Sequence, residues 1–165
     1  ATLAGKRFHA KRNHISKFYR TYTDTRFETL SDSNIPDALT VAKLWCAEND
    51  TDPEASSEIM AIRGMGDLKD EYNVKGAVLY VDSKPVAMTL GSEISPKVYD
   101  INFEKALREY DGVYAVINNE FAKTLTQYEY INREEDMGLD GLKKSKLSYN
   151  PVIILDRWNA IPKKR

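Results

Sequence analysis

The chain has 165 residues, of which 42% are hydrophobic and 10% aromatic, enough for one globular domain with a buried core. Charged residues make up 30% of it, yet the formal net charge is only -1, which excludes a disordered polyelectrolyte and a uniformly basic nucleic-acid binder. Residues 1–20 nevertheless carry six Lys and Arg side chains and no acidic one, so the N-terminal segment is basic.

The first part of the chain predicts a strand and three helices. Residues 6–22 have apolar side chains at helical spacing, interrupted by basic ones, and "RFETL" follows as a short strand. Pro36 and Asp37 open a second helix with a continuous apolar stripe. Asp52 is the expected N-cap, and Pro53 the first-turn proline, of a third helix.

The middle of the chain changes from helical to extended periodicity. "VKGAVLYVD" and "KPVAMTLGSEIS" predict the two strands of a hairpin, joined at the turn residues 82–85. "VYDINFE" alternates strictly between apolar and polar residues. A strand there is expected to place Asp100, Asn102 and Glu104 together on one face.

The last part of the chain predicts two more helices and two more strands. A helix is expected over residues 113–125, a strand at "YEYIN", a helix over 138–149 and a final strand at "VIILD". Acidic residues at 134–136 and lysines at 143–146 flank the second of these helices, as its dipole favours. The whole order predicts a mixed α/β fold, with a mostly antiparallel central sheet flanked by helices.

Cysteine usage and hydropathy point to a cytoplasmic protein. Cys46 has no partner for an internal disulfide and lies in an apolar helical pattern, so we expect a buried, reduced thiol. The longest apolar runs are too short to span a bilayer. His9 and His14 make no recognisable ligand set with that one cysteine, so no metal is expected. Because the chain begins at Ala1 and is helical early, we expect a fragment or one half of a longer protein.

Three long motifs carry a family resemblance. "KRFHAKRNHISKFYRTY", "INFEKALREYDGVYAVINNEFAKTL" and "YINREEDMGLDGLKKSKLSYNPV" are together similar to a largely uncharacterised bacterial family related to the C-terminal domain of phosphatidylglycerol lysyltransferase. The resemblance covers nearly the whole chain. It implies a GNAT-like (acyl-CoA N-acyltransferase) fold over residues 25–165, preceded by a basic linking helix at 1–24, and a companion GNAT-like N-terminal half.

The resemblance also implies a reaction. The expected function is transfer of an acyl or aminoacyl group from an aminoacyl-tRNA or acyl-CoA donor to an amine or hydroxyl acceptor. In the GNAT fold the strands that match "VYDINFE" and "YEYIN" splay apart, and the donor enters between them. Glu104 would then be the catalytic base, and Tyr149 resembles in position the tyrosine that protonates a leaving thiolate. The alternatives are the polar face of an amphipathic strand for Glu104 and a core tyrosine for Tyr149.

Donor binding is expected at the start of the helix after "VYDINFE". GNAT enzymes hold the donor pyrophosphate there with a glycine-rich loop, but this chain has a single glycine, Gly112, with Lys105 as a nearby anion holder. Arg133 would clamp a carboxylate or phosphate, or else form a salt bridge with Glu104, Glu120 or Asp136. The residues expected to bind donor or substrate are Arg7, Lys11, Arg12, Asn102, Lys105, Gly112, Asn118, Asn132 and Arg133.

The basic N-terminal helix supports a second hypothesis. Arg7, Lys11 and His14 share one helix face, with Arg12 beside them, and such a cluster can hold the phosphates of a tRNA, a lipid headgroup or a nucleotide. The plainer interpretation is a solvated face at a domain junction. The alternative function is therefore a non-catalytic GNAT-like half that docks an RNA or a partner domain.

Overall fold

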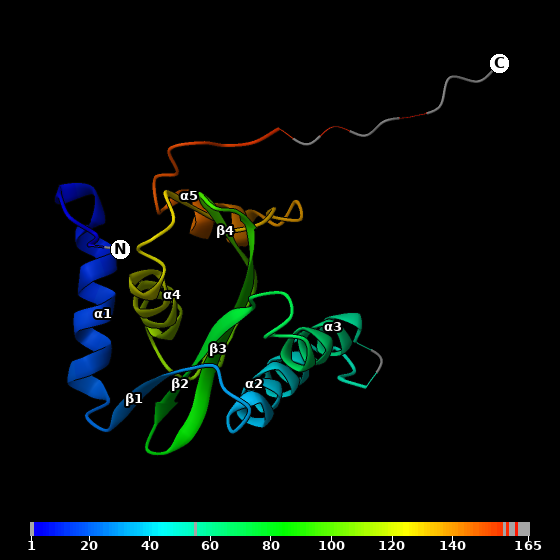
Figure 1. The fold of residues 1–165 in the computed structure, drawn as a ribbon. Coiled ribbons are helices and arrows are strands. Elements are labelled where there is room, and N and C mark those ends of the chain that lie inside the picture. Colours follow the sequence, from blue (N-terminus) through cyan, green and yellow to red (C-terminus); the bar gives the residue numbers. More distant parts are fainter. Residues whose placement is uncertain (1, 55, 157, 159–160, 162–165) are drawn as a thin grey trace. The chain divides into compact units, whose positions relative to one another are not determined.

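The computed structural model describes residues 2–54, 56–156, 158 and 161, and the chain divides into two compact units, Ala1–Glu134 and Glu135–Arg165. In the first unit the described residues form one sheet with the strand order β1-β2-β3-β4-β5 (Figure 1). Neighbouring strands are antiparallel, except that β5 runs parallel to β4. The strands are β1 (Thr25–Thr29), β2 (Lys75–Val81), β3 (Lys84–Ser95), β4 (Val98–Ala106) and β5 (Tyr130–Asn132).

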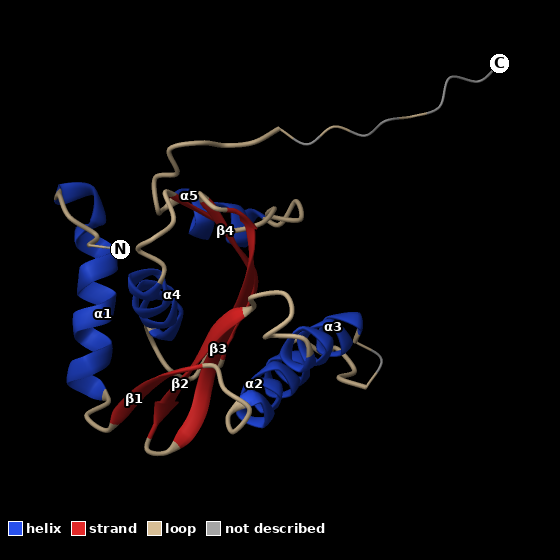
Figure 2. Cartoon of the chain, in the orientation of Figure 1, coloured by secondary structure: helices blue, strands red, loops and turns tan. Residues whose placement is uncertain are grey.

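Helices cover both faces of this sheet (Figure 2). On one face lies α4, and α1 packs against α4; on the other face lie α2 and α3. Because both faces are buried, β2 is a continuous apolar run, "GAVLYV", rather than an alternating one. The predicted mixed α/β fold is confirmed. The helices are α1 (His9–Thr21), which follows a 3-10 turn at Lys6–Phe8, α2 (Ile35–Glu48), α3 (Ser57–Asp67) and α4 (Val113–Thr124).

The hairpin of β2 and β3 is confirmed in detail. Asp82 and Ser83 form its turn with φ angles of 48° and 64°, in the left-handed region that a two-residue hairpin turn of this hand requires. The strand β3 covers the predicted range, Lys84–Ser95. Turn chemistry therefore sets this part of the fold locally.

The predicted start of α3 is wrong. The helix is capped by Ser56, whose Oγ accepts a hydrogen bond of 3.4 Å from the backbone nitrogen of Ile59. Asp52 instead accepts a hydrogen bond of 3.0 Å from the backbone nitrogen of Glu54. An Asp-Pro pair suits a tight turn as well as a helix start, and here it forms the turn.

The predicted final strand is also wrong. Residues 152–156 belong to no strand, and the side chains of Val152, Ile153, Ile154 and Leu155 are 79%, 55%, 70% and 80% exposed. A run of β-branched residues favours extended backbone, but a strand also needs a neighbour to pair with. Sequence pattern does not supply that neighbour.

The second unit contains α5 (Asp140–Leu147), which is shorter than predicted. Asp140 lies in its first turn and Lys144 and Lys146 lie in its last turn, the distribution that the helix dipole favours. Asp136 belongs to a turn before the helix, where its Oδ1 accepts a hydrogen bond of 3.0 Å from the backbone nitrogen of Gly138. The acids at 134–136 therefore precede the helix, as predicted.

Two expectations from composition can be checked directly. Cys46 is 1% exposed, so its predicted burial is confirmed. Within the described ranges, no helix combines the length and apolar character that a membrane crossing requires.

Candidate active site at the fork of the sheet

The strands β4 and β5 pair over a short stretch and then part. Their parallel ladder joins Val98 to Tyr130, Tyr99 to Ile131 and Asp100 to Asn132. Beyond this point β4 continues to Ala106, whereas β5 has ended. The predicted fork of the sheet is therefore confirmed, and the outer edge of β4 after Asp100 has no strand partner among the described residues.

A register shift in β4 changes which side chains share a face. Leu90 of β3 pairs with Phe103 and Gly91 pairs with Ile101, so Asn102 is an inserted residue, a β-bulge. Tyr99 and Ile101 pack in the core on the α4 face, but Phe103 packs against the core on the α2 and α3 face. The expectation that Asp100, Asn102 and Glu104 share one face is wrong, because the bulge interrupts the alternation.

Gly91 permits the close approach of β3 to the fork. A Cβ atom on this residue would lie 2.1 Å from the backbone oxygen of Asp100 and 2.6 Å from the ring of Tyr99. No other residue fits this gap without moving backbone atoms.

On the α4 face, Glu104 is the centre of a polar cluster. Its carboxylate accepts one hydrogen bond of 2.9 Å from Nδ2 of Asn118 and another of 2.9 Å from Nη2 of Arg133. The side chains of Glu104 and Arg133 are 9% and 23% exposed. Arg133 therefore forms the salt bridge with Glu104 that the sequence offered as its alternative role.

A second cation from α1 lies beside this pair. Burial lowers the pKa of the Lys11 ammonium, the positive charge of Arg133 lowers it further, and the negative charge of Glu104 partly opposes both effects. The structure therefore brings together four of the predicted site residues, Lys11, Glu104, Asn118 and Arg133. We call this group the closed side of the fork.

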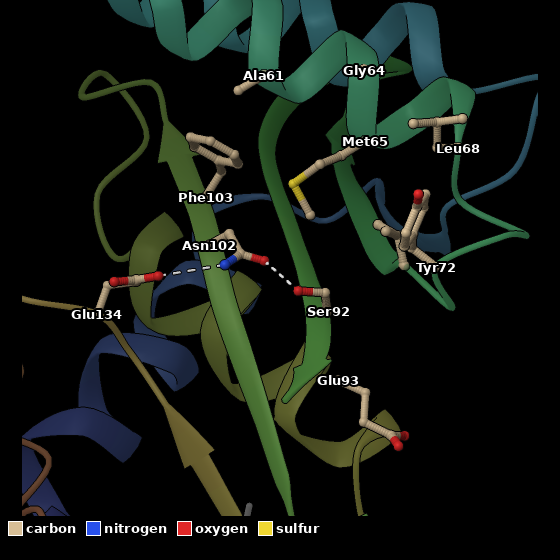
Figure 3. Close-up of a pocket in the computed structure, with 11 residues that line it drawn as sticks. Ala61, Gly64, Met65, Leu68, Tyr72, Ser92, Glu93, Asn102, Phe103 and Glu134 are labelled. Carbon is tan, nitrogen blue, oxygen red and sulfur yellow. Dashed lines mark hydrogen bonds between the residues drawn. The ribbon is translucent and has the colours of Figure 1, made fainter. Parts of the chain in front are cut away.

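On the α2 and α3 face, the fork opens into a pocket of about 780 Å³ (Figure 3). Asn102 connects its polar groups. The Oδ1 of Asn102 accepts a hydrogen bond of 3.0 Å from Oγ of Ser92, and its Nδ2 donates to Oδ2 of Asp100 at 3.0 Å and to Oε1 of Glu134 at 3.4 Å. Glu134 has a φ of 54°, an uncommon left-handed conformation for this residue type and one that marks a position held by its surroundings.

The rest of the pocket wall is mostly apolar. Met65 and Leu68 come from α3 and the turn after it, and Phe103 comes from β4 (Figure 3). Glu93 also lines the pocket, but its carboxylate points away from Asn102 and Glu134 (Figure 3) and accepts a hydrogen bond of 2.6 Å from Oη of Tyr128. A concave, largely apolar wall with a few polar groups at one end is typical of a small-molecule site.

Lys105 does not join the closed side of the fork. Its Nζ lies 2.6 Å from Oε2 of Glu58 and 3.6 Å from the ring centroid of Trp45, both on the α2 and α3 face. Adjacent residues of a strand point to opposite faces, so Lys105 and Glu104 diverge. The expectation that Lys105 supports an anion beside Glu104 and Gly112 is therefore not met by this arrangement.

Gly112 precedes α4 with a φ of 86°, but it faces α1. A Cβ atom there would lie 2.9 Å from the backbone oxygen of His14. Beside it, Oδ2 of Asp111 forms a salt bridge of 2.6 Å with Nζ of Lys17. The start of α4 is therefore bordered by a carbonyl oxygen and a carboxylate, which do not favour an anion.

The basic face of α1 is divided among several contacts. Nη1 of Arg12 donates to the backbone oxygens of Leu3 and Gly5 at 2.6 and 2.8 Å. The guanidinium of Arg7 lies 5.0 Å from the ring centroid of Phe8. Lys11 lies at the fork, so the side chains of Arg7, Lys11 and Arg12 do not form one continuous basic patch. Binding of RNA through them stays a prediction.

The last two predicted site residues, Asn132 and Tyr149, lie at the ends of β5 and α5. Asn132 ends β5 opposite Asp100. Tyr149 follows α5 in the second unit, where its backbone nitrogen donates to the oxygen of Lys146 at 3.1 Å. Its role as a proton donor stays a prediction.

The pocket contains residues that sequence reasoning missed. Glu134 directly follows Asn132 and Arg133, which were expected at the fork, and that adjacency was a usable signal. No signal in the sequence pointed to Ser92, Met65 or Phe103, because a serine in a strand and apolar residues in core patterns are common everywhere. Only the packing of α3 on the bulged strand brings them together.

Comparisons with known proteins show the family and the fold. Residues 1–161 match the model of the family "Phosphatidylglycerol lysyltransferase, C-terminal". The chain belongs to this family. An uncharacterized protein of Mycoplasmoides gallisepticum is 23% identical over 159 residues, which cover 95% of this chain and 51% of that protein.

A crystal structure of a conserved protein of unknown function from Bacteroides thetaiotaomicron VPI-5482 is similar to this member of the family, with 41% identity and a TM-score of 0.86. The match covers 93% of this chain and 53% of that one, so the chain spans about half the length of these relatives.

Acetyltransferases share the fold at low identity. A possible acetyltransferase from Clostridium difficile 630 is 15% identical with a TM-score of 0.61, over 86% of this chain and 97% of that one. The enzyme AAC(6')-Iy, in complex with a bisubstrate analogue of CoA, is 9% identical with a TM-score of 0.62, over 86% and 99% of the two chains. The predicted GNAT fold is confirmed.

Proposed function

We propose that the protein transfers an acyl or aminoacyl group to an amine or hydroxyl acceptor at the fork between β4 and β5. The observation that carries this proposal is the loss of strand pairing after Asp100 and Asn132, directly beside a pocket whose polar groups include Asn102 and Glu134. An unpaired strand edge offers backbone groups to an acyl carbonyl, and the pocket offers space to the acceptor. Membership of the lysyltransferase family and the acetyltransferase fold support the same chemistry.

The reaction requires mainly that the protein orient the acceptor toward the acyl donor. The lone pair of the acceptor nitrogen or oxygen forms a bond to the acyl carbon, and the bond from that carbon to the donor's leaving oxygen or sulfur breaks. The acceptor's proton passes to a carboxylate, and the leaving group takes up a proton. Because an activated ester already reacts with an oriented amine, proximity supplies much of the acceleration.

In this proposal Glu134 replaces Glu104 as the base. Glu134 lines the pocket, whereas Glu104 faces α4 and is held by Asn118 and Arg133. Glu104 then acts as a positioning residue that fixes Arg133 after β5, and through it the adjoining Glu134. Tyr149 keeps its proposed role as the donor of a proton to the leaving group.

The proposed donor is an aminoacyl-tRNA rather than an acyl-CoA. What supports this choice is the packing of His14 against Gly112, where a pyrophosphate-binding loop was expected, and the acidic Asp111 beside it. Lys11 and Arg133 supply positive charge at the fork, where they would meet phosphates near the donor's ester.

The experiment offers the protein a pool of aminoacyl-tRNAs or acetyl-CoA, with amine and alcohol acceptors, and detects acylated products by mass spectrometry. We expect products with the aminoacyl donors. Glu134→Gln should lower kcat by about 10²-fold, the typical contribution of a general base. Glu104→Gln should lower the melting temperature and raise the KM for the donor more than it lowers kcat.

Glu120→Gln is the matched control, because Glu120 forms a salt bridge of 2.7 Å with Lys123 on α4 and does not line the pocket, and this change should leave turnover unchanged. The proposal fails if no donor and acceptor pair gives product. An unchanged kcat in Glu134→Gln, with a large loss in Glu104→Gln, would return the role of base to Glu104. A rise in melting temperature with acetyl-CoA alone would overturn the choice of donor, because only a ligand of the folded state stabilises it.

A further inference from the structure

The outer edge of β4 has a defined far end. The backbone nitrogen of Leu107, directly after the strand, donates to the oxygen of Val86 at 3.0 Å, on the β3 side. Because successive N–H groups of a strand alternate in direction, the N–H of Ala106 points to the outer edge, away from β3. Among the described residues, the edge without a strand partner therefore runs from Asp100, where pairing with β5 stops, to Ala106, a length of about 20 Å.

Tyr114 occupies this far end of the edge. Its Oη accepts a hydrogen bond of 2.9 Å from Nε1 of Trp45, and the backbone N–H of Ala106 donates to the same oxygen. Burial raises the pKa of Tyr114, and these two hydrogen bonds oppose the rise only in part, so the phenol stays protonated at neutral pH. A ligand at this point finds the N–H of Ala106 already bonded.

Trp45 and Tyr114 reach the edge from opposite faces of the sheet. Trp45 belongs to α2 and Tyr114 to the first turn of α4, and these two helices cover different faces. The hydrogen bond between them therefore passes around the outer edge of β4. We call this contact between Trp45 and Tyr114 the edge bridge.

The edge bridge is supported by Lys105. The Nζ of Lys105 lies 3.6 Å from the ring centroid of Trp45 and forms a salt bridge of 2.6 Å with Oε2 of Glu58. The Lys105 side chain is 11% exposed, so water screens these contacts little. Lys105, which was expected to hold an anion, therefore fixes the ring of Trp45 instead.

The edge bridge lies across a path that a long ligand would follow. A linear group that extends from the fork toward the start of α4 must run along the outer edge of β4, because the strand ends at Ala106 and the helix begins at Val113. At Ala106 this group meets the ring of Tyr114. A compact ester whose carrier leaves the edge before Ala106 does not meet that ring.

We propose that Trp45 and Tyr114 are specificity-determining residues, which limit the donor to acyl groups whose carrier does not follow the edge of β4 past Ala106. The proposal rests on the proposed function, because it requires a donor that enters at the fork. The edge bridge disfavours thioesters on a long linear arm by steric exclusion, a way of rejecting a ligand that needs no charge. It therefore acts independently of Asp111 at the start of α4.

The test compares two thioesters that share a reactive end and carry no phosphate. S-acetyl-N-acetylcysteamine has a short arm, and S-acetylpantetheine has a long one. Binding is measured by NMR without any acceptor. The amide signals of residues 101–104 report the edge and the indole N–H signal of Trp45 reports the edge bridge, whereas Trp158, which is 87% exposed, gives a reference signal.

We expect the wild type to bind S-acetylpantetheine no more tightly than the short thioester. Tyr114→Ala removes the ring from the edge. It should bind the long thioester about fivefold more tightly, the gain from burying one further methylene group, and the short one equally well. Trp45→Phe keeps a ring beside Lys105 but releases the hydroxyl of Tyr114, so it should give a smaller gain in the same direction.

Tyr19→Ala is the matched control. Tyr19 lies on α1 and is 39% exposed, against 40% for Tyr114, and its removal should change neither affinity.

The inference is overturned if the wild type prefers the long thioester, if Tyr114→Ala leaves the ratio of the two affinities unchanged, or if Tyr114→Ala binds neither thioester. A changed ratio with no transfer from any donor would refute the proposed function, while the limit that the edge bridge sets on a bound arm would stand. Equal transfer from acetyl-CoA by the wild type and Tyr114→Ala would support the transferase and remove the edge bridge as its specificity determinant.

Discussion

The two sides of the fork differ in what their carboxylates contact. On the closed side, Glu104 lies between Asn118 and Arg133 and its side chain is 9% exposed. On the other side, Glu134 borders a pocket of about 780 Å³ and accepts a hydrogen bond of 3.4 Å from Asn102. Arg133 and Glu134 are neighbours in sequence, yet Arg133 bonds to Glu104 on the closed side and Glu134 to Asn102 on the pocket side. One side holds the fork together and the other borders the pocket.

The largest effect should come from breaking the closed side. Arg133→Ala leaves the Glu104 carboxylate mostly buried without its cation, so we expect the free energy of unfolding to fall by about 3 kcal/mol. Urea denaturation measures this loss. Lys97→Ala is the control, because its salt bridge of 3.3 Å with Glu129 joins side chains that are 76% and 51% exposed.

The free energy of unfolding of Lys97→Ala should fall by less than about 1 kcal/mol. If Arg133→Ala and Lys97→Ala lose equal amounts, the closed side is no more than a surface ion pair, and the distinction between the two sides is lost.

Two glycine substitutions, one at the start of α4 and one in the helix that borders the pocket, should change the free energy of unfolding in opposite directions. Gly112→Ala adds a Cβ atom 2.9 Å from the backbone oxygen of His14, at a φ of 86°, so we expect a loss of about 2 kcal/mol. Gly64 lines the pocket within α3, and a Cβ atom there has no neighbour within 4 Å. Gly64→Ala should therefore gain about 0.5–1 kcal/mol from helix propensity alone.

Thermal and urea unfolding of both variants measure these changes. A tolerated Gly112→Ala would show that α1 does not pack tightly against the start of α4. A destabilised Gly64→Ala would show that the pocket side is as tightly packed as the closed side.

The smallest effect should come from Lys11. Its lowered pKa means that the folded state disfavours the charged form, so Lys11→Met should gain stability at neutral pH, by less than about 1 kcal/mol because the site is half solvated. As pH rises through the folded-state pKa toward the ordinary value of 10.5, the wild-type amine loses its proton and the advantage of the variant disappears.

The measurement is the difference in unfolding free energy between Lys11→Met and the wild type, from neutral pH to about pH 10. A difference that grows with pH, or a destabilised variant at neutral pH, would show that the folded state does not disfavour the charged form of Lys11.

Much of the fold could be predicted because its signals are local. The hairpin at Asp82 and Ser83, the buried run of β2 and the start of α2 at Pro36 each depend on a few adjacent residues. The predictions of the start of α3 and of a strand at 152–156 were wrong for two different reasons. Two good N-cap candidates, Asp52 and Ser56, competed for one helix, and an apolar segment with high strand propensity had no partner strand among the described residues.

The site was predicted in part. Glu104, Asn118 and Arg133 were expected near the fork, and the structure joins them. Lys105 and Gly112 were expected to act with them, but side-chain direction and the packing of α1 separate them. The divergence of Lys105 from Glu104 follows from strand alternation, whereas the packing of α1 against Gly112 does not follow from spacing along the chain.

By itself the sequence determined the α/β class and the order of most elements, because hydrophobic periodicity and turn residues act over a few positions. The parting of two strands was implied by the family resemblance. Only the tertiary structure decided which charges meet and which face a pocket. The single inserted residue at Asn102 reverses the alternation of β4, and the packing of α1 and α3 on opposite sides then makes one side closed and the other open. Contacts between segments far apart in sequence are set by the burial of both faces of the sheet, and no local pattern encodes them.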